Sequence, residues 1–286
     1  MRIDHLVQSP QPTFSFEFFP PKTPVGEVNL IKTVQSLQPL EPSFVSVTCG
    51  AMGTSCGKTV EWAKQIRDEA NLEPLVHLTC LGASEEFLNK ALEEIAKADL
   101  KNILALRGDA PAEGVGAKSH CQHANELIEL IRKRYPGACI AAACYPEKHT
   151  EAPSMISDLE AMKLKAGAGA DVFLTQLFFD NRHYFEFVGR ARSMGITQPI
   201  VPGIMPIQNV DQIKRFTGIC GASIPKNLMG LLEQYQDTPR AVFHIGVAHA
   251  IAQSQELLNN GAPGIHFYTL NKSPATRLVV QALRQA

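Results

Sequence analysis

The stretch FSFEFFPPKT at residues 14–23 places one ionisable carboxyl, that of Glu17, among four phenylalanines. Polar and aromatic residues alternate, so Glu17 shares one face of a predicted strand with Ser15 while the other face is wholly aromatic. Phe19 falls on the Glu17 face and indicates that this face is buried too. A carboxyl in such a poor solvent is expected to have a raised pKa and to act as an acid near neutral pH. A half-exposed surface strand shows the same alternation, so this stretch alone leaves a structural role open.

Polar residues also gather where the other predicted strands end. In chain order they are Thr48, His77, Thr79, Arg107, Gly108, Asp109, Tyr145, Glu147, His149, Thr175, Gln176, His266, Tyr268 and Lys272. Taken singly, His77 and Gln176 fit buried core side chains equally well, and Arg107 with Asp109 fits a local ion pair. Taken together, they indicate an active site at one rim, where Arg107 can hold an anion and Asp109 can accept hydrogen bonds from a heterocycle.

The elements that must position these residues alternate along the chain. Short apolar runs predict eight strands, at residues 14–19, 43–48, 74–79, 101–107, 138–145, 171–177, 199–204 and 264–269. Helical patterns lie between them, for example at 58–71, 84–98 and 121–135, and a last one covers 274–284. Runs that are apolar on both faces are typical of parallel strands covered by helices. The pattern predicts an α/β fold, a single (β/α)8 TIM barrel over residues 1–286 with its chemistry at the carboxyl ends of the strands.

An open, doubly wound sheet is the alternative fold. It usually carries a glycine-rich phosphate turn after the first strand, whereas this chain has Pro20 and Pro21 there. The barrel is therefore favoured.

Composition limits the partners. With 27 basic and 28 acidic side chains well mixed along the chain, no nucleic-acid partner is expected. The amino terminus lacks the pattern of a secretory signal and no apolar run is long enough to span a bilayer, so we expect a cytoplasmic protein without a membrane partner. Seven cysteines without a C-x-x-C pair indicate free thiols and no metal site.

Several segments together resemble the methylenetetrahydrofolate reductase family. They run in family order and are FSFEFFPPKT (14–23), VSVTCGA (45–51), HLTC (77–80), LRGD (106–109), ACYPE (143–147), TQLFFD (175–180) and HFYTLN (266–271). They cover nearly the whole chain, and several span six or more residues, so the set is highly specific. The chain resembles the short bacterial form, a catalytic barrel without a regulatory domain.

The resemblance implies an FAD-containing reductase of one-carbon metabolism. In this family NADH or NADPH reduces the flavin and leaves, and 5,10-methylenetetrahydrofolate then binds and is reduced to 5-methyltetrahydrofolate in a ping-pong sequence. Glu17 matches the general acid that protonates N10 of the folate. Asp109 matches the second catalytic residue, beside the flavin and the pterin. Family relatives are usually dimers or tetramers, so a homodimer or homotetramer is expected.

The family's binding residues can be carried over position by position. Those that fall where the family contacts FAD are Thr48, His77, Arg107, Gly108, Asp109, His123, Ala124, Tyr145, His149, Asp158, Ala161, Leu164 and Lys165. Lys165 would serve a phosphate. Those expected to bind the folate are Asp109, Gln176, Tyr268 and Lys272.

Some positions depart from the family pattern. Cys49 stands where an aromatic is common, and the loop 55–59 has a single lysine where relatives usually carry arginines. His123 replaces a flavin-side tyrosine. Lys272 replaces an arginine that would meet the glutamate tail of the folate, so it keeps the charge but loses the bidentate fork. The two catalytic positions are unaffected, and the expected reaction type stands.

Two other functions share part of this pattern. A flavin-free barrel that transfers a methyl group from a folate would need the folate contacts but not the flavin-side set, and it would be colourless. A catalytically silent binding barrel would carry Glu17 and Asp109 by coincidence.

Overall fold

The computed structural model describes residues 1–19, 23–48, 56–109, 119–272 and 274–285. Their strands are β1 (Thr13–Phe18), β2 (Phe44–Val47), β3 (Pro74–Thr79), β4 (Asn102–Leu106), β5 (Cys139–Cys144), β6 (Val172–Thr175), β7 (Ile200–Val201), β8 (Gly203–Ile204) and β9 (Gly264–Tyr268). They form one sheet in the order β7-β6-β5-β4-β3-β2-β1-β9-β8, and every pairing is parallel. The sheet confirms the predicted barrel.

The predicted strand at 199–204 is divided in two. Pro202, which has no N–H to donate to a strand ladder, separates β7 from β8. β7 pairs with β6, and β8 pairs with β9, so the two halves together fill one strand position and close the barrel. The carbonyl of Pro202 still accepts a hydrogen bond from the backbone N–H of His266 at 2.9 Å. The expectation of one continuous strand is therefore wrong at this residue.

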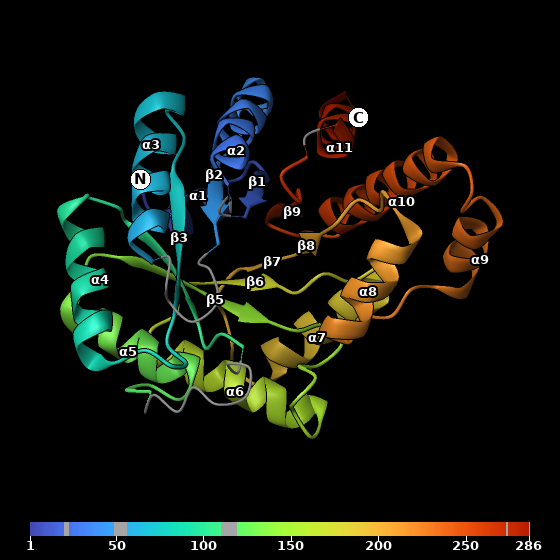
Figure 1. The fold of residues 1–286 in the computed structure, drawn as a ribbon. Coiled ribbons are helices and arrows are strands. Elements are labelled where there is room, and N and C mark those ends of the chain that lie inside the picture. The colour runs from blue at the N-terminus through green and yellow to red at the C-terminus, as the bar shows by residue number, and fades with distance from the viewer. Residues whose placement is uncertain (20–22, 49–55, 110–118, 273, 286) are drawn as a thin grey trace.

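Helices surround the strands (Figure 1). They are α1 (Ile3–Val7), α2 (Pro24–Leu37), α3 (Cys56–Ala70), α4 (Glu85–Lys97), α5 (Ala124–Arg134), α6 (Met155–Ala168), α7 (Asn181–Ser193), α8 (Val210–Cys220), α9 (Lys226–Gln234), α10 (Pro239–Asn259) and α11 (Pro274–Gln285), with a 3-10 turn at Gln38–Leu40. Side-chain caps fix the residue at which several helices begin. At the start of α4, for example, the hydroxyl of Ser84 accepts a hydrogen bond from the N–H of Phe87 at 3.2 Å, as expected of an N-cap.

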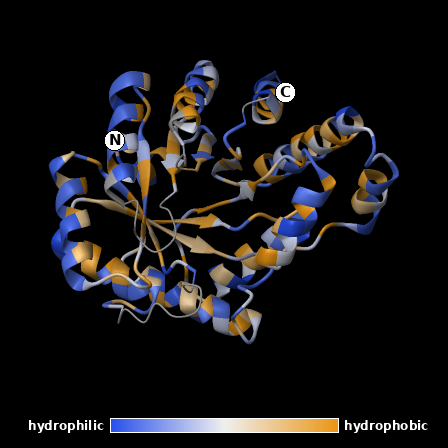
Figure 2. Ribbon diagram, viewed as in Figure 1, coloured by the Kyte–Doolittle hydropathy of each residue, from blue (hydrophilic) through white to orange (hydrophobic). Residues whose placement is uncertain are grey.

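Two apolar layers hold the barrel together. The larger layer lies between strands and helices and includes Phe14, Phe16 and Phe18 of β1, which confirms the predicted aromatic face. The smaller layer includes Leu75, Leu104 and other inward-facing strand residues. The strands are mostly apolar in Figure 2, whereas the helices carry hydrophilic residues on their outer sides.

Helix α1 packs against the inner layer. Ile3 and Val7 are buried there with strand residues from around the barrel. Asn102, fully buried at the start of β4, accepts from the N–H of Ile3 at 2.8 Å and donates to Glu73 at 2.8 Å. Because this is the amino end of the strands, the opposite end of the barrel is left for the polar residues.

Other expectations can be compared with the described residues. Cys80, Cys121, Cys139, Cys144 and Cys220 are free thiols, as predicted. The predicted helix at 121–135 begins later, at Ala124, because His123 adopts the extended backbone of an N-cap. None of the helices in the described ranges is both long enough and apolar enough to cross a membrane.

Candidate active site

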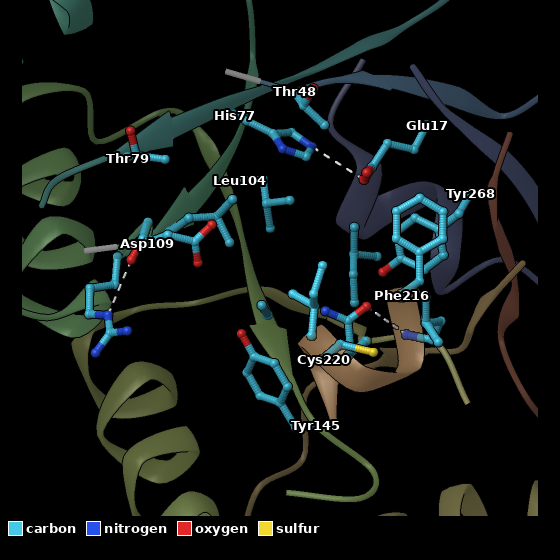
Figure 3. Close-up of a pocket in the computed structure, with 18 of the residues that line it drawn as sticks. Glu17, Thr48, His77, Thr79, Leu104, Asp109, Tyr145, Phe216, Cys220 and Tyr268 are labelled. Atoms are coloured by element: carbon cyan, nitrogen blue, oxygen red, sulfur yellow. Dashed lines mark hydrogen bonds and ion pairs between the residues drawn. The ribbon is translucent and has the colours of Figure 1, made fainter. Parts of the chain in front are cut away.

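A cavity of about 450 Å³ opens at the carboxyl ends of the barrel strands. Its lining includes Glu17, Thr48, His77, Thr79, Arg107, Gly108, Asp109, Tyr145, His149, Gln176 and Tyr268. Figure 3 shows the cluster, in which the side chains of Glu17 and His77 point toward one another. The prediction that polar residues from separate strands meet at one rim is therefore confirmed in space, although their binding roles remain predictions.

The carboxyl of Glu17 is buried among polar groups from three other strands. Its Oε2 lies 3.3 Å from Nε2 of His266, accepts from the Ser46 hydroxyl at 3.3 Å and lies 3.6 Å from Nε2 of His77. The contact with His266 continues to Ser15, whose Oγ lies 2.8 Å from Nδ1 of that ring. Only 7% of Glu17 is exposed, so both faces of β1 are buried, as expected, although Phe19 lies beyond the end of β1 and is 41% exposed.

The expected rise in the pKa of Glu17 is wrong for this environment. Burial raises the pKa of Glu17, but the hydrogen bond with His266, the charges that His77 and His266 can carry and the Ser46 hydroxyl outweigh it, so the pKa lies below its ordinary value. Burial also lowers the pKa of His77 to about 4, so this imidazole is neutral at pH 7. The chain's own groups thus favour a carboxylate at rest.

Seven buried side-chain atoms lack a hydrogen-bond partner within the described part of the chain, and three of them belong to residues of the cavity. These three are the hydroxyl oxygens of Thr48 and Thr79 and Nε2 of His77. All three residues line the cavity. Next to Thr79, Gly108 has a left-handed φ of +86°, and a Cβ there would lie only 3.2 Å from Cβ of Thr79. A polar heterocycle could supply the missing hydrogen bonds of these three atoms and could approach the main chain at Gly108, where no side chain intervenes.

Two basic groups lie on the side of the cavity near β4 and β5: Arg107 in the lining itself, and Lys165 bound to the lining residue Ala143. The guanidinium of Arg107 forms a bidentate pair with Glu151, at 2.6 and 2.7 Å, and this pair raises the pKa of Arg107. Nζ of Lys165 donates to the carbonyl of Ala143 at 2.7 Å, and burial lowers the pKa of Lys165. Arg107 is held by a carboxylate and Lys165 by a backbone carbonyl. Each of these two cations could exchange that partner for a phosphate group.

The loop after β5 supplies an aromatic surface. The rings of Tyr145 and His149 meet edge to face, with centroids 4.7 Å apart. The backbone N–H of His149 donates to Asp158 at 2.9 Å, and Asp158 is itself buried in the first turn of α6. Asp158 therefore shapes the cavity by fixing the loop that lines it.

Tyr268 and Gln176 lie at the strand ends near the split strand. The hydroxyl of Tyr268 donates to the carbonyl of Thr175 at 2.7 Å, and burial raises the pKa of Tyr268 well above its ordinary value. Oε1 of Gln176 accepts from the N–H of Leu177 at 2.9 Å, which leaves its amide N–H groups to bind a ligand. A Cβ at Gly203 would lie 2.6 Å from the Tyr268 ring, so the ring position requires glycine there.

Seven predicted contact residues are outside the cavity lining: Asp158 and Lys165, described above, and five more. His123 and Ala124 sit at the start of α5, Ala161 and Leu164 are exposed on α6, and Lys272 is exposed after β9. Their roles remain predictions. Cys49 and Ser55, like Pro20 and Pro21, are outside the described residues.

The structure also adds residues that the sequence did not single out. Phe216, Ile219 and Cys220 line the cavity from α8, and Ser46 binds Glu17 from β2. In the sequence the α8 residues resemble one side of an ordinary amphipathic helix. The signal for Ser46 was present, because Ser46 and Thr48 are two residues apart on a strand and therefore share a face.

The fold and the site define a parallel barrel with a buried carboxyl–histidine centre at the carboxyl ends of its strands. A family model described as methylenetetrahydrofolate reductase matches residues 2–284. The chain is 35% identical to the 5,10-methylenetetrahydrofolate reductases of Escherichia coli and Pectobacterium carotovorum, covering 94% of this chain and 90% and 89% of those proteins. The chain belongs to the methylenetetrahydrofolate reductase family.

Longer relatives match as well. Methylenetetrahydrofolate reductase (NADH) 1 of Arabidopsis thaliana is 37% identical over 283 residues, and the chain spans about half the length of this relative, 48%. Among solved structures, an uncharacterized protein from Clostridium thermocellum that binds two copies of 5-methyl-5,6,7,8-tetrahydrofolic acid superposes with a TM-score of 0.69. It covers 100% of this chain and 98% of its own, and at 11% identity it supports the fold alone.

Proposed function

We propose that the chain is a single catalytic barrel that reduces 5,10-methylenetetrahydrofolate to 5-methyltetrahydrofolate with electrons from NADH or NADPH. The observation that carries the proposal is the buried Glu17 centre at the cavity mouth of a chain that belongs to this family. We infer a cytoplasmic enzyme, acting as a homodimer or homotetramer.

FAD fits the residues around the cavity. The unpartnered hydroxyls of Thr48 and Thr79 and Nε2 of His77 would meet the polar edge of a flavin ring. Arg107 and Lys165 would hold its phosphates. When bound, FAD supplies storage for one hydride between the nicotinamide donor and the folate.

Glu17 would supply the proton that opens the folate ring at N10. Its carboxylate is favoured at rest, so the acid form must be favoured once reactants cover the cavity mouth and exclude water. Burial already acts in that direction, and further loss of water would raise the pKa of Glu17. The contacts from Ser15 through His266 would hold the Glu17 carboxyl in position for this transfer.

The remaining side chains would orient the two reactants. Asp109 lines the cavity and is exposed to accept hydrogen bonds from the pterin, and the free amide N–H groups of Gln176 would bind the folate. We propose that donor and folate occupy this one cavity in turn, which gives the ping-pong order.

Comparing the two half-reactions in Glu17→Gln tests the proposed acid. The flavin content of Glu17→Gln and the rate at which the nicotinamide donor reduces its flavin should match wild type, because neither depends on the proton that Glu17 gives to the folate. Reduction of the folate should fall by a factor of about 100 or more. Glu93→Gln, at an exposed carboxyl on α4, is the matched control. Folate reduction at the wild-type rate in Glu17→Gln would rule out the assignment.

A further inference from the structure

The loop between β5 and α6 and the helix α8 form two walls of the cavity. Tyr145 and His149 line the cavity from the loop, and Phe216, Ile219 and Cys220 line it from α8. In Figure 3, Phe216 and Cys220 come from the same helix. The shape of the cavity therefore depends on how the two walls are held together.

The carboxyl of Glu147, in the loop, joins the two walls. It accepts from the backbone N–H of Ser223 at 3.0 and 3.1 Å and from the Ser223 hydroxyl, and it lies 3.4 Å from Nε2 of His183 on α7. Ser223 follows the last residue of α8 by three positions. The Glu147 side chain is only 13% exposed, which strengthens these contacts relative to those of a fully solvated carboxylate.

A second contact reinforces the first. Gly221 ends α8 in the left-handed conformation, with φ +75°. A Cβ at Gly221 would lie 2.9 Å from Cγ2 of Thr150, which belongs to the same loop as Glu147. The loop thus meets the end of α8 at two points.

The second half of α8 is held less fully than the first, by the packing of Phe216 and Cys220 on an apolar cluster and by an ion pair of Lys214 with Glu233 at 2.7 Å. Val210 and Ile213 are buried and anchor the first half, whereas every residue from Lys214 to Cys220 is at least partly exposed, and Ile219 is 65% exposed. The half that faces the cavity has no fully buried residue, so the contacts at its end add to a limited set of others.

We propose that Glu147 is a positioning residue that fixes the carboxyl-terminal half of α8 as the wall against which the folate and the nicotinamide donor bind. The identity of these two occupants rests on the proposed function, whereas the link between Glu147 and α8 does not. Glu147 touches neither reactant, so it acts through Phe216, Ile219 and Cys220.

Thiol labelling of Cys220 measures the link without any catalytic readout. Cys220 is half-buried, and trypsin releases it in the peptide from Phe216 to Lys226, so its reaction with iodoacetamide can be followed by mass spectrometry. Loss of a charge-assisted hydrogen bond in Glu147→Gln should speed labelling by about five- to tenfold. Ser223→Ala, which keeps the backbone N–H, should give a smaller increase, and Ser223→Thr should restore the wild-type rate.

The control is Glu186→Gln, a carboxyl of α7 that lines the same small surface cavity as Glu147 and pairs with Arg190. It should leave labelling unchanged. Equal labelling rates in Glu147→Gln and wild type would overturn the link. Because Ser223 is exposed, its variants are expected to fold even if those of Glu147 do not.

Steady-state kinetics then tests the positioning role. In Glu147→Gln the half-saturating concentrations of both folate and donor should rise about fivefold, while flavin content and the rate at saturation stay within about a factor of two of wild type. Faster labelling with unchanged half-saturation would overturn the positioning role. If wild type reduces no folate at all, the proposed function fails, and the labelling rates still decide whether Glu147 holds α8.

Discussion

The buried imidazole of His77 should make the stability of the protein depend on pH. Burial lowers the pKa of His77 to about 4 from an ordinary value of 6.5. As the pH falls through 6.5, the unfolded chain binds a proton at this residue and the folded protein does not. Protons therefore favour unfolding, so the stabilisation is fully present above pH 6.5 and is lost as the pH falls towards 4.

The size of the effect follows from the two pKa values. Between pH 8 and pH 5 they correspond to a loss of about 2 kcal/mol in the free energy of unfolding. Glu17, whose pKa lies below its ordinary value, titrates below this window. Because His249 also has a pKa lowered by burial, wild type alone would not isolate His77, and a variant is needed.

Urea unfolding of wild type and His77→Gln at pH 8, 7, 6 and 5 provides the comparison. The contribution of His249 is common to both proteins and cancels. Wild type should lose about 2 kcal/mol more than His77→Gln over this range. A difference between the two proteins that stays constant within about 0.5 kcal/mol, the usual limit of additivity, would refute the reasoning.

Three further predictions address the rest of the site. Gly203→Ala should lower the free energy of unfolding by about 1–3 kcal/mol, because its Cβ would lie 2.4 Å from the carbonyl oxygen of Thr175. Gly189→Ala on α7, where a Cβ would meet open space, should not destabilise the protein. Equal unfolding curves for the two variants would contradict this prediction. Folate reduction should fall as the pH rises through the pKa of Glu17, because the acid form is then lost. This pKa should be higher in the pH profile of kcat than in that of kcat/KM, because bound reactants exclude water; coincident profiles would argue against this. Lys272→Arg should bind folates that carry the glutamate tail more tightly than wild type does, with no gain for folates lacking its carboxylates; identical tail dependence in both proteins would end the idea.

Much of the barrel was predictable because its signals are local. The alternation around Glu17 identified a strand with two buried faces, and runs apolar on both faces identified parallel strands. The break at Pro202 could also have been anticipated from the missing N–H. What a single run could not show is that its two halves pair with different neighbours, since pairing is set by the closure of the whole barrel.

The strand-end residues that line the cavity were predictable from the sequence, and the electrostatics of the site were less so. Topology alone brings the carboxyl ends of parallel strands together, so the residues found at those ends meet at one rim. The direction of the Glu17 pKa depends on which groups face it. His266 lies 249 residues away in the sequence and Ser46 lies 29 away, and only the register of β1 with β9 and β2 brings them to Glu17.

The most direct test of the central claim, that the barrel mouth holds a flavin which passes a hydride to a folate, is an absorption spectrum. The visible spectrum of the purified protein is recorded first. It is recorded again after NADH or NADPH is added without air, and a third time after 5,10-methylenetetrahydrofolate is added. The prediction is a flavin spectrum that one nucleotide bleaches and the folate restores. A protein that stays colourless after FAD is added would contradict the claim and favour a flavin-free folate barrel.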